Sequence, residues 1–279
     1  MEKGMTLALI VDEQITSGRI ELPVLDQTAI RIQEMMSEGV YDAVAVEELV
    51  GSDPTLSSSL LRHANSSLFG GIAKVVTVRD AIVRLGVKHV AQLVLLSSIG
   101  KQYELENEAF QSLGAPLWRH AVATGMGARW LATRYLEDRV QEAFLGGLLH
   151  DIGKLLLVRV LDDLVSRKVI DFVPSQDLVS QILDGLHCAS GATLLQHWNI
   201  PDVYVDIVRT HHDEEYREND ALQSCIRLAD MACNRVGIGV QPPSDISLAA
   251  SVEAQRLRAS EVALAELEIV IEDSMELAQ

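Results

Sequence analysis

The sequence predicts an all-α protein with an aliphatic core. Hydrophobic residues make up 48% of the 279 residues and aromatic residues only 4%, so we expect aliphatic side chains to pack between helices. Apolar positions recur at helical spacing in one segment after another, and glycine, proline or polar residues separate these segments. No segment shows the strict alternation that is typical of a half-buried strand.

Two consecutive helices are expected around residue 53. Gly51 closes the first, and Ser52 or Asp53 caps the second, which has Pro54 at its first position. The pair is like a helix-turn-helix only in outline, because the segment PTLSSSLL offers no basic side chain to a DNA phosphate.

The segment HANSSLFG is expected to end the second of these helices. Asn65 and Ser66 are good helix-ending residues, and Phe69 with Gly70 suggests a tight turn covered by an aromatic ring. This structural role is favoured over a ligand pocket.

Composition and the positions of helix-breaking residues divide the chain into five parts. Paired prolines stop the helix before the linker, and the tail after them is acidic and amphipathic. The tail either packs on the body of the protein or serves as a dimerisation or partner-docking element. The parts are an N-terminal segment (1–17), an N-terminal helical lobe (18–110), a second helical lobe with a candidate metal site (111–237), a linker (238–247) and an acidic C-terminal helix (248–279).

Charge and cysteine content exclude several classes of function. The formal net charge of -17 repels phosphate backbones and anionic lipids, so nucleic acid and membranes are not expected as direct partners. No apolar run approaches the roughly 20 residues of a membrane span, which favours a cytoplasmic protein. Cys188, Cys225 and Cys233 show no CxxC spacing. They are expected to be buried apolar residues, which argues against a thiolate zinc site.

Polar side chains inside apolar helices carry the candidate chemistry. His150 and Asp151 lie in the apolar run GLLHDIGKLLL, where a buried carboxylate is costly unless it is paired or bound to a cation. Asp230 lies in a similar setting, within IRLADMAC. Six of the eight histidines fall in one stretch of the chain: His120, His150, His187, His197, His211 and His212.

Seven of these side chains form the candidate metal site. They come from five expected helices and offer only nitrogen and oxygen donors, so they could hold one or two divalent ions. Such a donor set favours Fe, Mn, Ni or a hydrolytic Zn site over a structural zinc site. Taken singly, each histidine could instead be a hydrogen-bonded core residue. The seven are His120, His150, Asp151, His187, His211, His212 and Asp230.

The order of these residues resembles the HD superfamily of metal-dependent phosphohydrolases. The resemblance rests on His120, the doublet of His150 and Asp151 with Lys154 one turn later, and Asp230. It implies catalytic roles for Asp151 and Lys154. Lys154 would serve as a counter-ion or contact a phosphate.

Two branches of that superfamily have further features in common with the chain. His187 followed by GATLL, with His211 and His212, resembles the dinuclear HD-GYP branch, but HHDEEYREND replaces its glycine-tyrosine-proline signature. The blocks SDPTLSSSLLRHANSSLFG and AFLGGLLHDIGKLLL, with others between about residues 18 and 213, resemble the HDOD branch. This resemblance implies a multi-helix HD-superfamily bundle with an N-terminal helical lobe, in a bacterial signalling context.

Three functions are therefore open. The first is a regulatory scaffold, with or without metal, that contacts a protein partner through its surface or its C-terminal helix. The second is a metal-dependent phosphohydrolase in which Asp151 bridges two ions; its substrate would be a small phosphorylated molecule, since the protein is strongly acidic. The third is a structural relic whose histidines bind no metal.

Overall fold

The computed structural model describes residues 2–19, 22–23, 27–40, 42–66, 73–105, 107–213 and 220–274. Over these residues the chain is helical and contains no strand, so the predicted all-α class is confirmed. Two compact units are present, one made of residues 24–102 and 198–200, the other of residues 1–23, 103–197 and 201–279.

The smaller unit is arranged around one buried helix. α6 contacts all four of the other helices described in this unit, and its Val90, Leu95 and Ile99 are fully buried. The helices are α2 (Gln27–Glu38), α3 (Ala43–Gly51), α4 (Pro54–Ala64), α5 (Val78–Leu85) and α6 (Val87–Gln102).

The predicted start of α4 is confirmed. The Asp53 side chain accepts hydrogen bonds from the amides of Thr55 (2.8 Å) and Leu56 (3.2 Å), and Pro54 occupies the first turn, where no amide is needed.

Asn65 ends α4 as expected, and its side chain also binds the backbone of Val75, ten residues later. Its side-chain amide donates to the carbonyls of Leu61 and Val75, each at 2.8 Å, and its side-chain oxygen accepts from the Val75 amide at 2.8 Å. Phe69 and Gly70, predicted to form a tight turn, lie outside the described residues.

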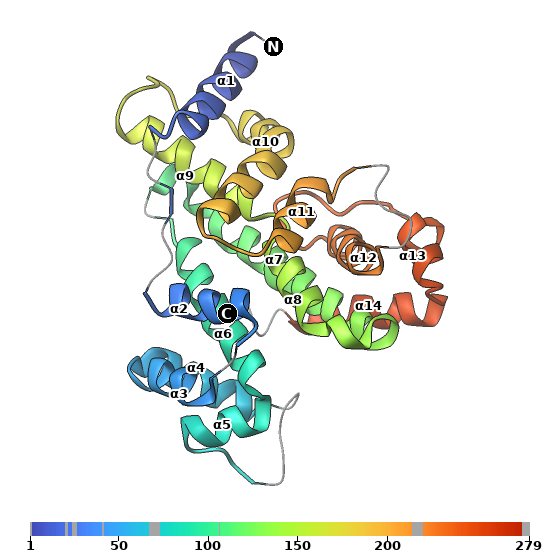
Figure 1. Ribbon diagram of the computed structural model, residues 1–279. Helices are drawn as coiled ribbons and strands as arrows, with labels where there is room; N and C mark the ends of the chain where they lie inside the picture. The colour runs from blue at the N-terminus through green and yellow to red at the C-terminus, as the bar shows by residue number, and fades with distance from the viewer. Residues whose placement is uncertain are drawn as a thin grey trace. The chain divides into compact units, whose positions relative to one another are not determined.

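The larger unit holds the candidate site. In Figure 1, α7 runs beside α8 and α12, and α9 runs beside α10. Its core is aliphatic, as predicted, with Leu145, Leu148, Leu155 and Leu156 fully buried. The elements are α1 (Glu2–Thr16), α7 (Glu108–Tyr135), η1 (Glu137–Arg139), α8 (Val140–Leu149), α9 (Ile152–Ser166), α10 (Gln176–His197), α11 (Asp202–Thr210), α12 (Ala221–Val236), η2 (Leu248–Ala250), α13 (Val252–Leu257) and α14 (Glu261–Asp273).

Two glycines allow the helices around the site to approach closely. A Cβ on Gly147 of α8 would lie 2.8 Å from the Cα of Gly125 in α7. A Cβ on Gly153 of α9 would collide with the His187 carbonyl oxygen and lie 2.6 Å from the Gly191 amide nitrogen, both in α10. The junction between α8 and α9 is thus packed tightly between α7 and α10.

Both ends of the larger unit pack on its body. α1 contacts α9 and α10, and α14 contacts α7 and α12. The acidic tail is not one continuous helix, because Arg258 adopts a left-handed backbone conformation (φ 53°) between α13 and α14. α14 buries Leu264, Leu267 and Ile271.

None of the described helices is by itself long and apolar enough to cross a membrane. α5 and α6 taken together pass on length and composition, but they meet at a bend of 112°.

Candidate metal centre

The candidate site forms around the break between α8 and α9. α8 ends at Leu149 and α9 begins at Ile152, so His150 and Asp151 occupy the junction. Their side chains are 1% and 5% exposed, and His150 Nε2 lies 3.4 Å from Asp151 Oδ2. Because the helical path is interrupted here, two adjacent side chains can face the same centre.

Four buried histidines are held in the same way. A carbonyl oxygen can only accept, so the Nδ1 that faces it carries a hydrogen, and in the neutral ring Nε2 is then the lone-pair donor. A hydrogen bond of this kind fixes the tautomer and orientation of metal-binding histidines. The pairs are His120 with Ile238 (2.8 Å), His150 with Gly147 (2.7 Å), His187 with Leu183 (2.7 Å) and His211 with Val208 (2.9 Å).

The first group of donors joins α7, the junction and α12. His120 Nε2 lies 3.3 Å from His150 Nε2, 3.5 Å from Asp151 Oδ2 and 3.1 Å from Asp230 Oδ1. Burial acts to raise the pKa of Asp230, but contacts with His120 and His150 outweigh it and hold that pKa well below its usual value. Asp230 is therefore an anion, and its Oδ1 also accepts from Asn234 (2.9 Å).

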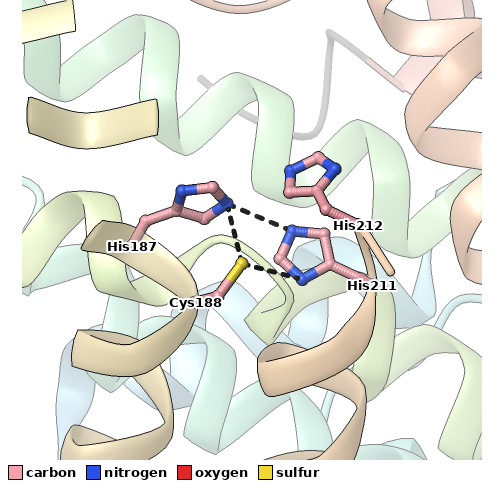
Figure 2. Close-up of side chains that lie close together, drawn as sticks. All are labelled: His187, Cys188, His211 and His212. Atoms are coloured by element: carbon pink, nitrogen blue, oxygen red, sulfur yellow. Dashed lines mark hydrogen bonds between the residues drawn. The ribbon is translucent and has the colours of Figure 1, made fainter. Parts of the chain in front are cut away.

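The second group joins α10 and the end of α11, as Figure 2 shows. His187 Nε2 lies 3.3 Å from His211 Nε2 and 3.4 Å from the Cys188 sulfur. The ring of His212, an exposed residue, lies 4.1 Å from that of His211 between centroids. One donor atom of each of the four residues lies within 4.8 Å of the others.

The cysteines differ in their surroundings. Cys225 and Cys233 are buried, as expected, and none of the three forms a disulfide. Cys188, in contrast, is only partly buried and lies among the histidines. Burial and the charge of Asp151 raise the pKa of its thiol to about 11. The only sequence signal for this position is its place directly after His187.

Asp151 links the two groups. Its Oδ2 faces the first group, and its Oδ1 lies 3.3 Å from His187 Nε2 and 3.5 Å from His211 Nε2. Since both of these rings carry their hydrogen on Nδ1, neither offers one to Oδ1, which is buried without a hydrogen-bond partner. A buried carboxylate oxygen surrounded by lone pairs is unfavourable unless a cation lies among them. The residues therefore fit one or two divalent metal ions.

The pKa values of the two groups differ. Burial lowers the pKa of His150, but Asp151 and Asp230 more than offset this and raise it to about 10, so a proton can supply positive charge in the first group. Burial, aided by the Lys154 charge, lowers the pKa of His187 to about 4. His187 accordingly presents neutral imidazole, the form that binds a metal.

Lys154 occupies the counter-ion position considered in the sequence. Its Nζ donates to Asp151 Oδ2 at 2.6 Å. Burial opposes the charge on Lys154, but the attraction of Asp151 outweighs it and raises the pKa of the ammonium. The same pair lowers the pKa of Asp151, against the effect of burial.

All seven sequence-predicted metal-binding residues lie in the larger unit and around this junction. Neither Cys188 nor the role of the predicted linker was expected from the sequence. Its first residue, Ile238, supplies the carbonyl that orients His120, and a Cβ on Gly239 would lie 3.3 Å from His120 Nδ1. Gly239 has a φ of 143°, a conformation that side chains rarely adopt.

The helical fold and the histidine–aspartate junction define a protein of the HD superfamily class. The model of the HDOD domain matches residues 22–214, most of the chain, and the protein belongs to the HDOD domain family.

Known structures share the fold of this chain, and a curated protein is similar to it in sequence. An HDOD domain protein of unknown function from Geobacter sulfurreducens is 21% identical, with a TM-score of 0.77 over 98% of both chains. A proposed metal-dependent phosphohydrolase from Shewanella amazonensis is 17% identical, with a TM-score of 0.76 over 99% of this chain and 100% of that one. At these identities the likeness shows the fold. An uncharacterised protein of Treponema pallidum is 23% identical over 222 residues, which are 76% of this chain but only 42% of that protein.

Proposed function

We propose that this protein is a cytoplasmic bacterial signalling domain whose helical core is organised by a divalent metal centre and whose output is contact with a protein partner. The observation that carries the proposal is the convergence of buried donors from α7, the α8–α9 junction, α10 and the end of α11 on one shared carboxylate, Asp151. Asp230 adds α12 to this set through its contact with His120. A bound metal would link all five segments, so its presence would alter the stiffness of the whole unit.

The burial of the donors supports an organising role. His120, His150, His187 and His211 are between 1% and 4% exposed, so a metal ion held by them would be enclosed by the helices that carry them. Lys154, which a phosphohydrolase would use to contact a phosphoryl group, is instead paired with Asp151.

The outer face of α14 supports the choice of partner. Val262 and Ile269 are 68% and 56% exposed, and they lie seven residues apart on one face of the helix. Exposed Glu261 lies directly before Val262, and exposed Glu272 lies three residues after Ile269. This face suits a protein segment with apolar and basic side chains, in keeping with the net charge of -17.

Hydrogen exchange tests the organising role. Metal-free protein is compared with protein loaded at about 100 times the dissociation constant, where binding should add about 2.7 kcal/mol to the free energy of unfolding. We expect slower amide exchange in α7, α8, α9, α10, α11 and α12 together, and no such change in Asp151→Asn. Slower exchange confined to one helix would contradict the proposal.

A photo-crosslinking side chain at Ile269 tests the partner face, with exposed Val169 as the control position. The proposal requires that the protein captured at Ile269 but not at Val169 binds purified wild type and loses that binding to Val262→Asp/Ile269→Asp. Equal binding by the double variant would exclude α14 as the docking face.

A phosphohydrolase remains the second candidate, favoured by one observation. The second donor group is the more open one, since His212 is exposed and Cys188 is only partly buried. A bound metal would supply Lewis acidity and a more acidic water there. Lys154 would neutralise negative charge on a bound phosphate. Asp151 would orient the donors of the two groups relative to one another.

Hydrolysis of bis(p-nitrophenyl) phosphate by metal-loaded protein tests this candidate. Turnover in the wild type that disappears in Asp151→Asn and falls in His212→Ala would support it. Turnover no higher than that of Asp151→Asn would exclude it for this class of substrate.

A further inference from the structure

We propose that Cys188 is a ligand of the second metal position, together with His187, His211 and His212, and that its thiolate biases this position toward Zn²⁺, Co²⁺ or Fe²⁺ over Mn²⁺. The inference rests on the proposed metal centre and deepens it. It also reverses the expectation, drawn from cysteine spacing, that no thiolate takes part.

The distances between donors match those around a metal ion. With metal–nitrogen bonds of about 2.0–2.1 Å, two nitrogens of a tetrahedral site lie roughly 3.3–3.4 Å apart. His187 Nε2 and His211 Nε2 are 3.3 Å apart. A sulfur bound at about 2.3 Å would lie roughly 3.6 Å from such a nitrogen. The Cys188 sulfur lies 3.4 Å from His187 Nε2.

The orientation of the four side chains is also suitable. Successive residues of a helix point about 100° apart, so His187 and Cys188 would normally diverge. In Figure 2 the His187 ring reaches back over the sulfur, and both face the end of α11, from which His211 and His212 project. The sulfur also approaches the His211 ring, at 3.9 Å from Nδ1.

A second observation points to a cation at the same place. Asp151 is 5% exposed, and its Oδ1 is aimed at the His187–His211 pair without a hydrogen-bond partner. A thiol that donates to His187 Nε2 would satisfy that nitrogen. It would still leave Asp151 Oδ1 and His211 Nε2 facing each other at 3.5 Å with no hydrogen between them. A metal held by the nitrogens and the sulfur satisfies all of these atoms at once.

The sulfur gives the two positions different metal preferences. The first group offers only nitrogen and oxygen from His120, His150, Asp151 and Asp230. Thiolate is a soft donor, which Zn²⁺ and Fe²⁺ accept and for which Mn²⁺ has little affinity. We therefore expect Mn²⁺ to enter the first position far more readily than the second.

Cobalt spectroscopy tests the assignment without relying on activity. Protein freed of metal with a chelator is titrated anaerobically with Co²⁺, and absorption is followed in the near ultraviolet and the visible. We expect an intense thiolate-to-cobalt charge-transfer band in the wild type. The band should be absent from Cys188→Ser, which should still bind Co²⁺ through the first group.

Two controls separate this inference from the proposed function. Cys225→Ala removes a buried thiol of α12 and should keep the band, and His150→Ala should keep it while losing cobalt from the first position. Cobalt bound without the band, or a band retained in Cys188→Ser, would overturn the role of Cys188 and leave the metal centre standing. No cobalt binding by the wild type would overturn both.

Alkylation of Cys188 in the wild type tests the same assignment without a variant, so it does not depend on the folding of Cys188→Ser. Zn²⁺ should protect Cys188 from iodoacetamide, with the modified residue identified by mass spectrometry, whereas Mn²⁺ should not. Equal labelling of Cys188 with and without Zn²⁺ would contradict the proposal.

Discussion

Oδ1 of Asp151 lies 3.3 Å from Nε2 of His187, and neither atom has a hydrogen to share. His187 uses its ring hydrogen on the Leu183 carbonyl, 2.7 Å away. The contact is therefore unfavourable as it stands and becomes favourable when a cation lies between the two atoms. This relationship favours a metal centre over a cluster of hydrogen-bonded core histidines.

Gly153→Ala should destabilise the protein by about 3 kcal/mol. The added methyl group would meet the His187 carbonyl oxygen in α10, and the backbone cannot move aside without shifting His187, a candidate metal ligand. Urea unfolding measures the loss.

The matched control for that substitution is Gly185→Ala, in the same helix α10 as His187. Nothing lies within 4 Å of a Cβ at Gly185, so alanine there should raise stability by up to about 1 kcal/mol. Equal effects of the two substitutions would show that the packing of α9 on α10 is looser than described.

The stability of metal-free protein should be greatest near pH 6.5. The folded pKa of His150 is raised to about 10, so its contribution is complete below pH 6.5 and is lost as the pH rises toward 10. The folded pKa values of His187 and His212 are lowered to about 4, so their contributions are present above pH 6.5 and are lost as the pH falls toward 4.

Urea unfolding in the presence of a chelator, measured at a series of pH values, checks this profile. His150→Gln should lose the decline on the alkaline side and keep the decline on the acid side. A wild-type protein that gains stability between pH 6.5 and pH 10 would contradict the assignment of His150.

Lys154→Met should cost about 3 kcal/mol in metal-free protein, because it leaves the buried Asp151 carboxylate without its cation. A bound metal should recover much of this loss, since it also compensates the carboxylate. The comparison is the unfolding free energy of the variant with and without metal.

Arg209→Met serves as the control for the loss of an ion pair. Arg209 and Asp206 are paired on the exposed surface of α11, so this substitution should cost less than about 1 kcal/mol, with or without metal. A cost for Lys154→Met that is the same in both states would argue against metal binding next to Asp151.

Asn65→Ala should destabilise the smaller unit by about 2 kcal/mol. It removes three hydrogen bonds and leaves the buried Val75 backbone without partners. Exposed Ser58→Ala, in the same helix α4, should change stability by no more than about 0.5 kcal/mol. Proteolysis of the segment after Asn65 should be faster in Asn65→Ala alone.

Much of the centre was predictable because charge inside an apolar helix is costly and therefore informative. Asp151 and Asp230 were predictable on that ground, and the histidines were predictable from their crowding in one stretch of the chain. Cys188 could not be found in this way, because a cysteine in an apolar helix is equally well explained as a core residue. The main-chain carbonyl of Ile238 has no side-chain signature at all.

The break in the acidic tail was not predicted either. Helices often end at glycine in the left-handed conformation, but here Arg258 adopts it. The residue that marks the start of α14 is Ser260, whose side chain accepts a hydrogen bond from the Ala263 amide at 3.2 Å.

The most direct test of the metal centre is elemental analysis of wild-type protein purified without added metal, beside His150→Ala and Asp151→Ala. We predict one or two equivalents of a first-row divalent metal in the wild type and a clear loss in both variants. A correctly folded wild type that contains no metal, and takes up none when metal is added, would contradict the central claim.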